Sequence, residues 1–574
     1  MSRCSSGGEE REAEIIQFYM YTRLFSILAA LLCAPGLSAR QPVRARNGMV
    51  VTRQINATDV GVAVLKSGGN AIDAAVAVGF ALAVTHPSAG NLGGGGFLLA
   101  RFADGKTTFL DFRERAPEKA SRNMYLDAGG KLTEDSKAGY RAAGVPGTVR
   151  GLELAHRQYG SRTWRELIDP AVQLAAKGFP VSWALSQSLK SNKLLPRFAE
   201  SKRIFQRDGN YYEAGEVLVQ PELARTLQRI RDLGSKDFYE GETARLFAAD
   251  MKANGGEITL EDLKNYTVRE RAPLVGSYKS YSIVTAPPPS SGGIGVLQML
   301  GVLEGSGYEK SGAGSASSTH MLAEAMRRYF ADRSEHVGDP DFVNVPVSAL
   351  LNKKYIASLG ASIDGERATP SAQVRPGEFA PYESTETTHY SIVDAQGNVV
   401  AVTYTLNGGF GNGVTLNKLG FLLNNEMDDF SAKPGEPNLF GLVQGEKNAI
   451  QPRKRPLSSM VPTIVLREGK PYLVTGSPGG PTIINTVLQT IVNVLDFGMN
   501  VQEAVDQPRI HHQWLPDAIV MEKGFSPDTV ALLKSRGHEI RNVSFIGEVA
   551  AILIDGGWLQ GAADGRVEAV AKGY

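Results

Sequence analysis

Two β-rich runs joined by a short turn are the feature of this chain that most restricts its fold. Residues 387–393 read Thr-Thr-His-Tyr-Ser-Ile-Val, residues 395–398 are turn-forming, and the return run continues to Thr405. The turn is centred near Gln396. An unbulged antiparallel hairpin would therefore place Thr387 beside Thr405 on one face, about 5 Å apart. The sequence thus predicts two hydroxyl groups that meet at the open end of a hairpin.

A threonine at the start of a strand becomes a useful nucleophile only when a base removes its proton. The chain contains no Gly-x-Ser-x-Gly elbow of a Ser-His-Asp hydrolase. A threonine at a chain terminus carries its own base, because an α-amine has a pKa of about 7.7 to 8.0. Cleavage between Glu386 and Thr387 would create such a terminus. The preceding residues 375–386 fit a flexible connector or an ordinary loop, and the hairpin alone also fits one with scattered threonines.

At this point the sequence resembles the γ-glutamyltranspeptidases, which are N-terminal-nucleophile hydrolases, from about residue 45 to the C-terminus. The resemblance implies an α/β fold, the layered αββα sandwich of that class. It also implies a precursor that cuts itself, in which the Thr387 hydroxyl attacks the Glu386 carbonyl and water opens the resulting ester. The products would be a large subunit, residues 40–386, and a small subunit, residues 387–574, which together form a heterodimer with one core.

The resemblance implies a γ-glutamyl substrate such as glutathione, whose recognised end is an α-amino acid. The carboxylate of that end needs a cationic fork and hydroxyl donors. Arg113, in the run Asp-Phe-Arg-Glu, and the adjacent Ser458 and Ser459 match the family positions for this role. Taken alone, the arginine would be a surface salt-bridge residue and the serines part of a loop.

The ammonium group of the same substrate needs amide or carboxylate acceptors. Asn407 lies just past the hairpin, and Glu426 and Asp429 lie in the run Asn-Asn-Glu-Met-Asp-Asp-Phe. These residues match the amino-group ligands of the family, although some relatives carry Gln at the position of Glu426. Taken alone, the acidic run would be a solvated turn, and its spacing does not match an EF-hand calcium loop.

The transition state needs donors for a developing oxyanion. Gly479 and Gly480, in Thr-Gly-Ser-Pro-Gly-Gly-Pro, present backbone N–H groups with no Cβ in the way. A tight turn explains the same glycines, but they match the oxyanion loop of the family. By the same resemblance, Thr405 would orient the Thr387 hydroxyl. The γ-glutamyl ester on Thr387 would then pass its acyl group to water or to an amino acid or peptide acceptor.

Residues 434–445 resemble a lid loop of the family, with Phe440 where several relatives have a Tyr that closes the pocket. Phenylalanine has no hydroxyl to latch that lid. Two alternatives stay open. A related amide hydrolase of the cephalosporin acylase type would keep Thr387 but relax the amino-acid clamp, which is complete here. A processed but inactive binding protein on the cell surface would not need the nucleophile and oxyanion motifs that this chain retains.

The N-terminal residues predict export. Residues 24–34 are apolar, a basic residue precedes them, and small residues follow up to Ala39, the pattern of a secretory signal peptide. The acidic stretch before Met20 is wrong for such a signal, so Met20 is the expected start and cleavage is expected near Ala39. The mature protein would be periplasmic or secreted, with no stable membrane span. A membrane anchor and lipidation at Cys33 are the alternatives.

Charge and cysteine content exclude several classes of protein. The 61 basic and 60 acidic residues give a formal charge of +1, and no basic stripe of the kind that binds nucleic acid is present. The two cysteines, Cys4 and Cys33, would be lost with the signal peptide. His511 and His512 are adjacent and lack spaced partners, so neither a metal nor an organic cofactor is expected.

The remaining pattern indicates the layering. A helix over 70–84, capped by Asn70 and apolar on nearly all sides, is expected to be buried. The glycine block at 88–97 indicates close backbone packing rather than phosphate binding, because no Lys-Ser/Thr follows it. Helices dominate 140–380, strands are expected near 388–405, 418–424, 461–466 and 471–476, and helices near 482–496 and 499–506. This order of elements favours two halves that share one sheet core.

Overall fold

The computed structural model describes residues 40–377, 388–433, 438–439 and 446–574. Residues 42–574 form one compact unit, which includes residues from both sides of the expected cut. The predicted cleavage pair Glu386 and Thr387 and the lid residue Phe440 lie outside the described residues, as does the expected signal peptide.

The centre of the fold is a pair of seven-stranded sheets in which all neighbouring strands are antiparallel. Both sheets combine strands from before and after the expected cut. In order across the first sheet, the strands are β21 (Val570–Gly573), β2 (Met49–Thr52), β12 (Thr388–Val393), β13 (Val399–Thr405), β3 (Gly95–Arg101), β4 (Thr107–Asp111) and β9 (Arg269–Arg271). In the second they are β1 (Val43–Ala45), β20 (Trp558–Ala563), β19 (Ala550–Asp555), β15 (Lys470–Gly476), β14 (Thr463–Arg467), β11 (Tyr281–Thr285) and β10 (Leu274–Tyr278).

Alternating side chains on the first sheet serve two hydrophobic cores. On β13, Val400 and Val402 belong to the core beneath the first layer of helices, whereas Val399 and Ala401 belong to the core that includes the second sheet. This period of two is the expected consequence of the β-strand pleat. Thr403 and Thr405 have the same parity as Val399, so their side chains face the space between the two sheets.

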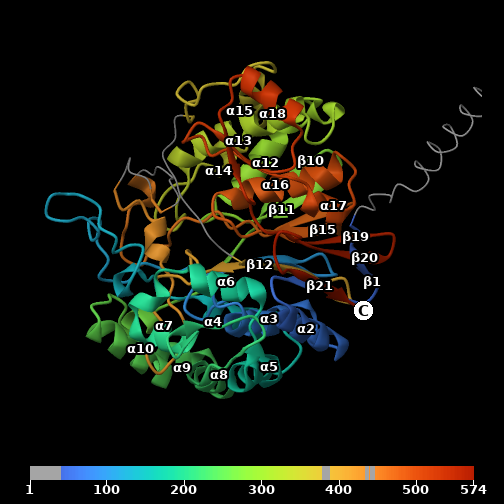
Figure 1. Cartoon of the computed structure of the whole chain (residues 1–574). Helices are drawn as coiled ribbons and strands as arrows, with labels where there is room; N and C mark the ends of the chain where they lie inside the picture. Colours follow the sequence, from blue (N-terminus) through green and yellow to red (C-terminus); the bar gives the residue numbers. More distant parts are fainter. Residues whose placement is uncertain (1–39, 378–387, 434–437, 440–445) are drawn as a thin grey trace, which may run out of the picture. The chain divides into compact units, whose positions relative to one another are not determined.

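Helices cover both outer faces and complete the predicted αββα sandwich (Figure 1). Against the first sheet lie α2 (Ile55–Lys66), α3 (Ala71–Thr85) and α4 (Thr148–Tyr159), while α5 (Trp164–Lys177) packs on α3, and α8 (Pro221–Leu233) packs on α5. Against the second lie α12 (Gly292–Leu303) and α16 (Thr482–Leu495), and α13 (Ala316–His336) packs on α12. The other α-helices are α6 (Trp183–Ser191), α7 (Ala199–Phe205), α9 (Ser235–Glu240), α10 (Glu242–Ala253), α11 (Leu260–Lys264), α14 (Val347–Leu350), α15 (Lys353–Ala361), α17 (Val501–Asp506) and α18 (Pro527–Ser535).

The remaining described strands are short. A small sheet contains β16 (Ile510–His511), β17 (Ile519–Glu522) and β18 (Ile540–Val543), and two pairs contain β5 (Phe179–Pro180) with β8 (Val217–Leu218) and β6 (Gln206–Arg207) with β7 (Asn210–Tyr211).

Helix α3 confirms the expected buried helix. Asn70 caps it, since its side chain accepts from the Asp73 N–H and the Asp73 carboxylate accepts from the Asn70 N–H, each at 2.9 Å. All its residues are buried. A helix that is apolar on every side has no face to offer water, so α3 lies wholly within the core.

The glycine block packs backbone against backbone, as predicted. A Cβ at Gly93 would lie 2.2 Å from the Leu422 carbonyl oxygen, and one at Gly94 only 1.9 Å from the Thr405 carbonyl oxygen. No side chain fits at such distances. These glycines therefore allow the chain to pass directly beneath the end of β13.

The strand predicted at 418–424 is wrong. Only isolated bridges form nearby, between Gly93 and Leu423 and between Thr415 and Leu422. Lys418 and Gly420 have φ angles of +63° and +75°, which are incompatible with extended β-structure. The apolar run that suggested a strand is instead a turn whose side chains enter the core.

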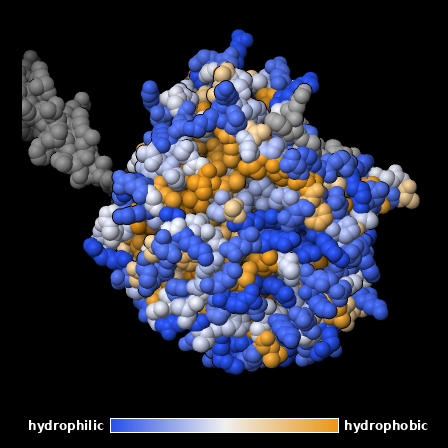
Figure 2. All heavy atoms as spheres, turned by 180° about the vertical axis from the view of Figure 1, so that it is seen from behind, coloured by the Kyte–Doolittle hydropathy of each residue, from blue (hydrophilic) through white to orange (hydrophobic). Residues whose placement is uncertain are grey.

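One face of the molecule is mostly hydrophilic, with apolar side chains gathered in its upper half (Figure 2). Among the described residues, no helix is both long enough and apolar enough to cross a membrane.

Candidate active site

The central hairpin has the register predicted from its turn. Thr388 pairs with Tyr404 and His389 with Thr403, without a bulge. The predicted neighbour of Thr405 is Thr387, which lies outside the described residues. The register thus supports the expected meeting of two hydroxyls, while the pairing of Thr387 itself stays a prediction.

The end of β13 leads directly into an acidic turn. The Thr405 hydroxyl accepts a hydrogen bond from the Asn407 backbone N–H at 2.8 Å. Asn407 has a φ of +72°, a conformation that asparagine tolerates better than most residues, and its side-chain amide donates to the Asn425 carbonyl at 3.0 Å. Asn425 precedes the single helical turn Glu426–Asp429. Hydrogen bonds therefore join Thr405 to Asn407, itself an expected amino-group ligand, and Asn407 to the residue that directly precedes Glu426.

Arg113 lies at the centre of a buried charge cluster. The residue is only 1% exposed. Its guanidinium forms ion pairs with Glu426 and Asp429, and it donates to the Pro456 carbonyl at 3.2 Å and the Leu457 carbonyl at 2.9 Å. The structure thus brings together the predicted carboxylate ligand, Arg113, and two of the three predicted ammonium ligands, Glu426 and Asp429. In this single-chain state these groups pair with one another.

The same cluster contains more carboxylate than guanidinium, because Glu114 is a third buried acid, 3.5 Å from the Arg113 guanidinium. Burial raises the pKa of Glu114 to about 7 despite the nearby arginine. Burial also raises the pKa of Glu426, with repulsion from Glu114 and Asp429 contributing. Glu114 Oε1 and Glu426 Oε2 are buried and have no hydrogen-bond partner among the described residues. One guanidinium therefore faces three buried carboxyl groups, and an ammonium group would supply both positive charge and hydrogen-bond donors to this excess of carboxylate.

Sequence analysis did not assign a role to Glu114. It stands beside Arg113 in the same run, but an acidic neighbour of an arginine is usually a solvated partner. Only its complete burial, which depends on packing against distant segments, distinguishes it.

The predicted serines lie at the other side of Arg113, directly after Leu457. Ser458 Oγ accepts from the Met460 N–H at 3.2 Å. Ser459 Oγ accepts from Arg333, a buried residue of α13 that also donates to Ser291 Oγ at 2.9 Å. Sequence analysis expected mostly helices over 140–380 but could not tell that this arginine is buried. Arg333 places a second guanidinium on the expected carboxylate side of the site.

The predicted oxyanion glycines form the turn between β15 and α16. Gly479 and Gly480 have φ angles of +125° and +65°, so the turn needs glycine at both positions. Among the described residues, neither N–H group has an acceptor within hydrogen-bonding distance. Gly476, at the end of β15, packs against the His389 ring of the hairpin, since a Cβ there would lie 2.3 Å from the ring. The turn and the hairpin are therefore held together.

His389 is the histidine nearest in sequence to Thr387, but its hydrogen bonds are already used. Its ring nitrogens contact Thr403 Oγ1 at 2.8 Å and Ser391 Oγ at 3.1 Å, and Ser391 Oγ donates to the Ala550 carbonyl. Burial lowers the pKa of His389 to about 3, so the ring is neutral. His389 therefore has a structural role, and the general base for the threonine nucleophile must be another group. A terminal α-amine would be such a base.

The raised pKa of Glu114 predicts a pH-dependent contribution to stability. Its pKa is about 7 in the folded chain and 4.5 ordinarily. The protonated carboxyl therefore stabilises the fold fully below pH 4.5, and this contribution is lost as pH rises through 7. We expect Glu114→Gln to lose less stability than the unsubstituted protein between pH 5 and 7.5, measured as the urea midpoint. The exposed Glu118→Gln is the matched control, and equal losses in all three proteins would contradict the prediction.

Two facing antiparallel sheets between helical layers, with a hairpin that leads into a buried charge cluster, define this chain as an N-terminal-nucleophile hydrolase by fold and site. A family model described as Gamma-glutamyltranspeptidase matches residues 57–574. The chain therefore belongs to the γ-glutamyltranspeptidase family. It is 52% identical over 538 residues to the Glutathione hydrolase proenzyme of Escherichia coli (strain K12), covering 93% of each protein.

Solved structures agree with the fold. The crystal structure of cephalosporin acylase from Bacillus halodurans matches with a TM-score of 0.84 at 28% identity, covering 94% of this chain and 98% of that one. Helicobacter pylori gamma-glutamyltranspeptidase matches at 45% identity with a TM-score of 0.56, covering 60% of this chain and 97% of that one. The family assignment predicted from the sequence and the αββα fold are both confirmed.

Proposed function

We propose that this chain is a precursor that cuts itself before Thr387 and then hydrolyses or transfers γ-glutamyl groups through an ester on the Thr387 hydroxyl. The protein is a γ-glutamyltransferase and hydrolase of the glutathione hydrolase type, made as a precursor. The observation that carries the site assignment is the buried cluster around Arg113, with its excess of carboxylate. That cluster fits the zwitterionic end of a γ-glutamyl group.

Binding would proceed by exchange of ion pairs. The α-carboxylate of the substrate binds to the Arg113 guanidinium and to the hydroxyls of Ser458 and Ser459. Its ammonium group binds to the carboxylates of Glu426 and Asp429. The entering zwitterion has no net charge, so the exchange leaves the net charge of the cluster unchanged while each charged group keeps a partner. The unpartnered Oε2 of Glu426 gains a donor at the same time.

Thr387 acts twice in this proposal. In the precursor its Oγ attacks the Glu386 carbonyl carbon, and the peptide nitrogen leaves with the hydroxyl proton and becomes the free Thr387 amine. Water then hydrolyses the ester, which releases the Glu386 carboxylate and restores the Thr387 hydroxyl. In turnover that amine takes the Oγ proton as Oγ attacks the γ-carbonyl, and the proton passes to the departing amine. Water then releases glutamate, or the amine of an amino acid or peptide acceptor forms a new γ-glutamyl bond.

Gly479 and Gly480 would stabilise the tetrahedral intermediate. Their N–H groups have no acceptor among the described residues, and the turn that holds them is packed against the hairpin. Donors fixed in advance at the site of developing negative charge stabilise the transition state without reorganisation.

The Gly479→Ala variant tests this role. A Cβ at Gly479 would lie 2.5 Å from Thr482 Oγ1, so the peptide must shift away from its position. We expect kcat to fall about 10²-fold to 10³-fold, the effect of losing one oxyanion donor. Gly498→Ala is the control, since Gly498 also has a positive φ but open space around it. Equal kcat values for the two variants would remove Gly479 from the mechanism.

The proposed function is tested by expression from Met20, denaturing electrophoresis and N-terminal sequencing of each band. We expect two fragments, the smaller beginning at Thr387, and release of nitroaniline from γ-glutamyl-p-nitroanilide. Glutaryl-p-nitroanilide lacks the α-amino group, so comparing the rates of cleavage of the two compounds distinguishes a γ-glutamyl enzyme from an acylase. Faster cleavage of the glutaryl compound would favour an acylase, and an uncut, inactive but folded chain would favour the binding protein.

We also propose export by a signal peptide cut near Ala39, with the mature enzyme periplasmic or secreted. The larger fragment of the same experiment should then begin near Arg40. A fragment that begins before residue 30 would contradict cleavage.

A further inference from the structure

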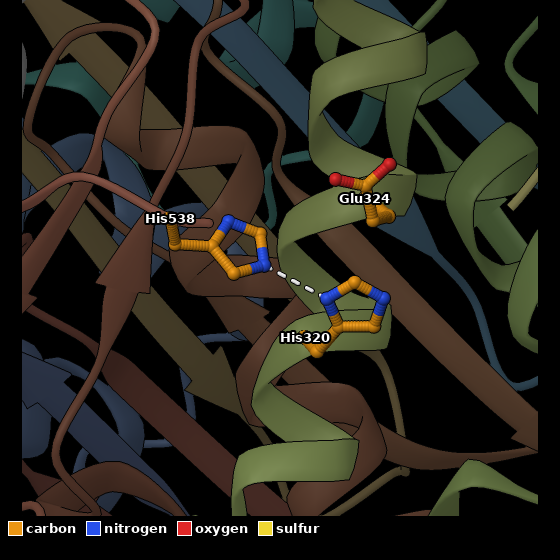
Figure 3. Close-up of side chains that lie close together, drawn as sticks. All are labelled: His320, Glu324 and His538. Atoms are coloured by element: carbon orange, nitrogen blue, oxygen red, sulfur yellow. Dashed lines mark hydrogen bonds between the residues drawn. The ribbon is translucent and has the colours of Figure 1, made fainter. Parts of the chain in front are cut away.

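Three buried side chains that could bind a metal lie together in the described part of the chain, outside the proposed active site (Figure 3). His320 and Glu324 are one turn apart on α13, and His538 lies in the loop between α18 and β18. One potential ligand atom from each residue lies within 4.8 Å of the other two. The histidines are 218 positions apart, so no sequence spacing could have revealed the group.

The hydrogen bonds fix which histidine nitrogens are available. His320 Nε2 donates to the Asp364 carbonyl at 2.8 Å, which leaves a lone pair on Nδ1. His538 Nε2 then donates to that lone pair, also at 2.8 Å. This leaves His538 Nδ1 as a buried acceptor without a partner. A histidine whose other nitrogen donates to a backbone carbonyl is oriented as metal ligands usually are.

Glu324 provides an ionised oxygen donor. Oε1 accepts from Arg327 Nε at 3.1 Å and the Thr369 N–H at 3.2 Å, but Oε2 accepts only from Arg328 Nη1 at 2.6 Å. One lone pair of Oε2 is therefore available. Burial opposes ionisation of Glu324, but Arg327, Thr369 and Arg328 together lower its pKa, so the carboxylate is charged at neutral pH.

We propose that His320 Nδ1, His538 Nε2 and Glu324 Oε2 bind one divalent transition ion of the Zn²⁺ type, with a water molecule in the fourth position. The ion replaces the hydrogen bond between the histidines. The proton of His538 moves from Nε2 to Nδ1, so the nitrogen that lacked a partner becomes an N–H group and no charge is lost. Tetrahedral Zn–N bonds of 2.0–2.1 Å require the two ligand nitrogens to separate to about 3.3 Å.

The surrounding charges decide which ions fit. Arg327 and Arg328 oppose a cation, although Asp517 pairs with Arg327 and lies 3.4 Å from His512. Two neutral imidazoles and one carboxylate suit ions that bind nitrogen strongly, such as Zn²⁺, Co²⁺ and Ni²⁺, and not Mg²⁺ or Ca²⁺. His320 and Glu324 precede the expected cut and His538 follows it. A bound ion would therefore join the two fragments.

Metal retention by the complete, processed and untagged protein tests the proposal. After dialysis against EDTA, the protein is equilibrated with ZnCl₂ and passed through a gel-filtration column to remove unbound ions. The retained metal is then measured by inductively coupled plasma mass spectrometry. We expect about one Zn²⁺ per chain pair, at least 10-fold less in His538→Gln, and no change in His156→Gln, a histidine outside the group. MgCl₂ and CaCl₂ should leave no retained ion. Equal zinc retention in His538→Gln would place the zinc elsewhere and overturn the site.

A second measurement needs no variant. CoCl₂ added to the apo-protein should give the intense visible absorption of tetrahedral Co²⁺, and one equivalent of ZnCl₂ should abolish it. If the ion joins the two fragments, the urea concentration at which half of the fragments have separated should be higher when Zn²⁺ is bound. The absence of both zinc retention and the cobalt band would overturn the proposal, even if His538→Gln failed to fold.

Discussion

Replacing Thr387 with alanine is expected to leave one uncut chain and to abolish γ-glutamyl transfer and hydrolysis. The variant lacks the Oγ that attacks Glu386 in the precursor and the γ-carbonyl in turnover. Loss of a covalent nucleophile costs roughly 10⁶-fold in kcat in hydrolases where it has been measured. Denaturing electrophoresis should show a single band, and assays with γ-glutamyl-p-nitroanilide should give no burst and no steady-state rate above background.

The neighbouring threonine provides a matched control. Thr388 is buried in β12, and its hydroxyl has no hydrogen-bond partner in the part of the chain that the structure describes. By the alternation of the strand it faces away from Thr405. Thr388→Ala should therefore be cut and active, while Thr387→Ser should cut more slowly and retain activity. A cut and active Thr387→Ala protein would exclude Thr387 as the nucleophile.

Local features of the fold were predictable because they depend on nearby residues. The hairpin register follows from turn position and β-pairing, and both match the structure. The capped helix α3 follows from Asn70, Asp73 and a continuous apolar run. The pairing of β12 with β2 and of β13 with β3 joins segments some 300 residues apart, so no local pattern contains it. The wrong strand at 418–424 shows the same limit, because apolar content predicts burial but not backbone conformation.

The same distinction between local and long-range features applies to the candidate site. The sequence contains residue types that can bind a zwitterion, and the resemblance to the family assigned a role to each of them. Their actual arrangement was not visible, because Arg113 meets Glu426 across 313 positions. Glu114 and Arg333 were missed for a related reason. Each is charged, and charged side chains are normally solvated, so only the packing of distant segments shows that they are buried.

Arg113→Ala is expected to damage both substrate binding and stability. It leaves the carboxylates of Glu114, Glu426 and Asp429 buried without their central cation. Removing one partner of a buried ion pair typically costs about 3–5 kcal/mol. It also removes the fork for the substrate carboxylate, and truncating a buried charge partner weakens binding by about 2–5 kcal/mol. We therefore expect KM to rise at least about 30-fold, the lower end of that range, together with a lower urea midpoint.

A charge-balanced variant separates these two effects. Arg113→Met combined with Glu426→Gln removes one positive and one negative group, so stability should return toward that of the unsubstituted protein while KM stays high. Arg115→Ala is the matched control, since Arg115 donates to the carbonyls of Arg453 and Asn265, forms no ion pair among the described residues and is partly exposed. If the double variant recovered both stability and an unchanged KM, Arg113 would serve only to neutralise its neighbours. A stable double variant whose KM is higher than that of Glu426→Gln alone would instead assign the guanidinium to the substrate carboxylate.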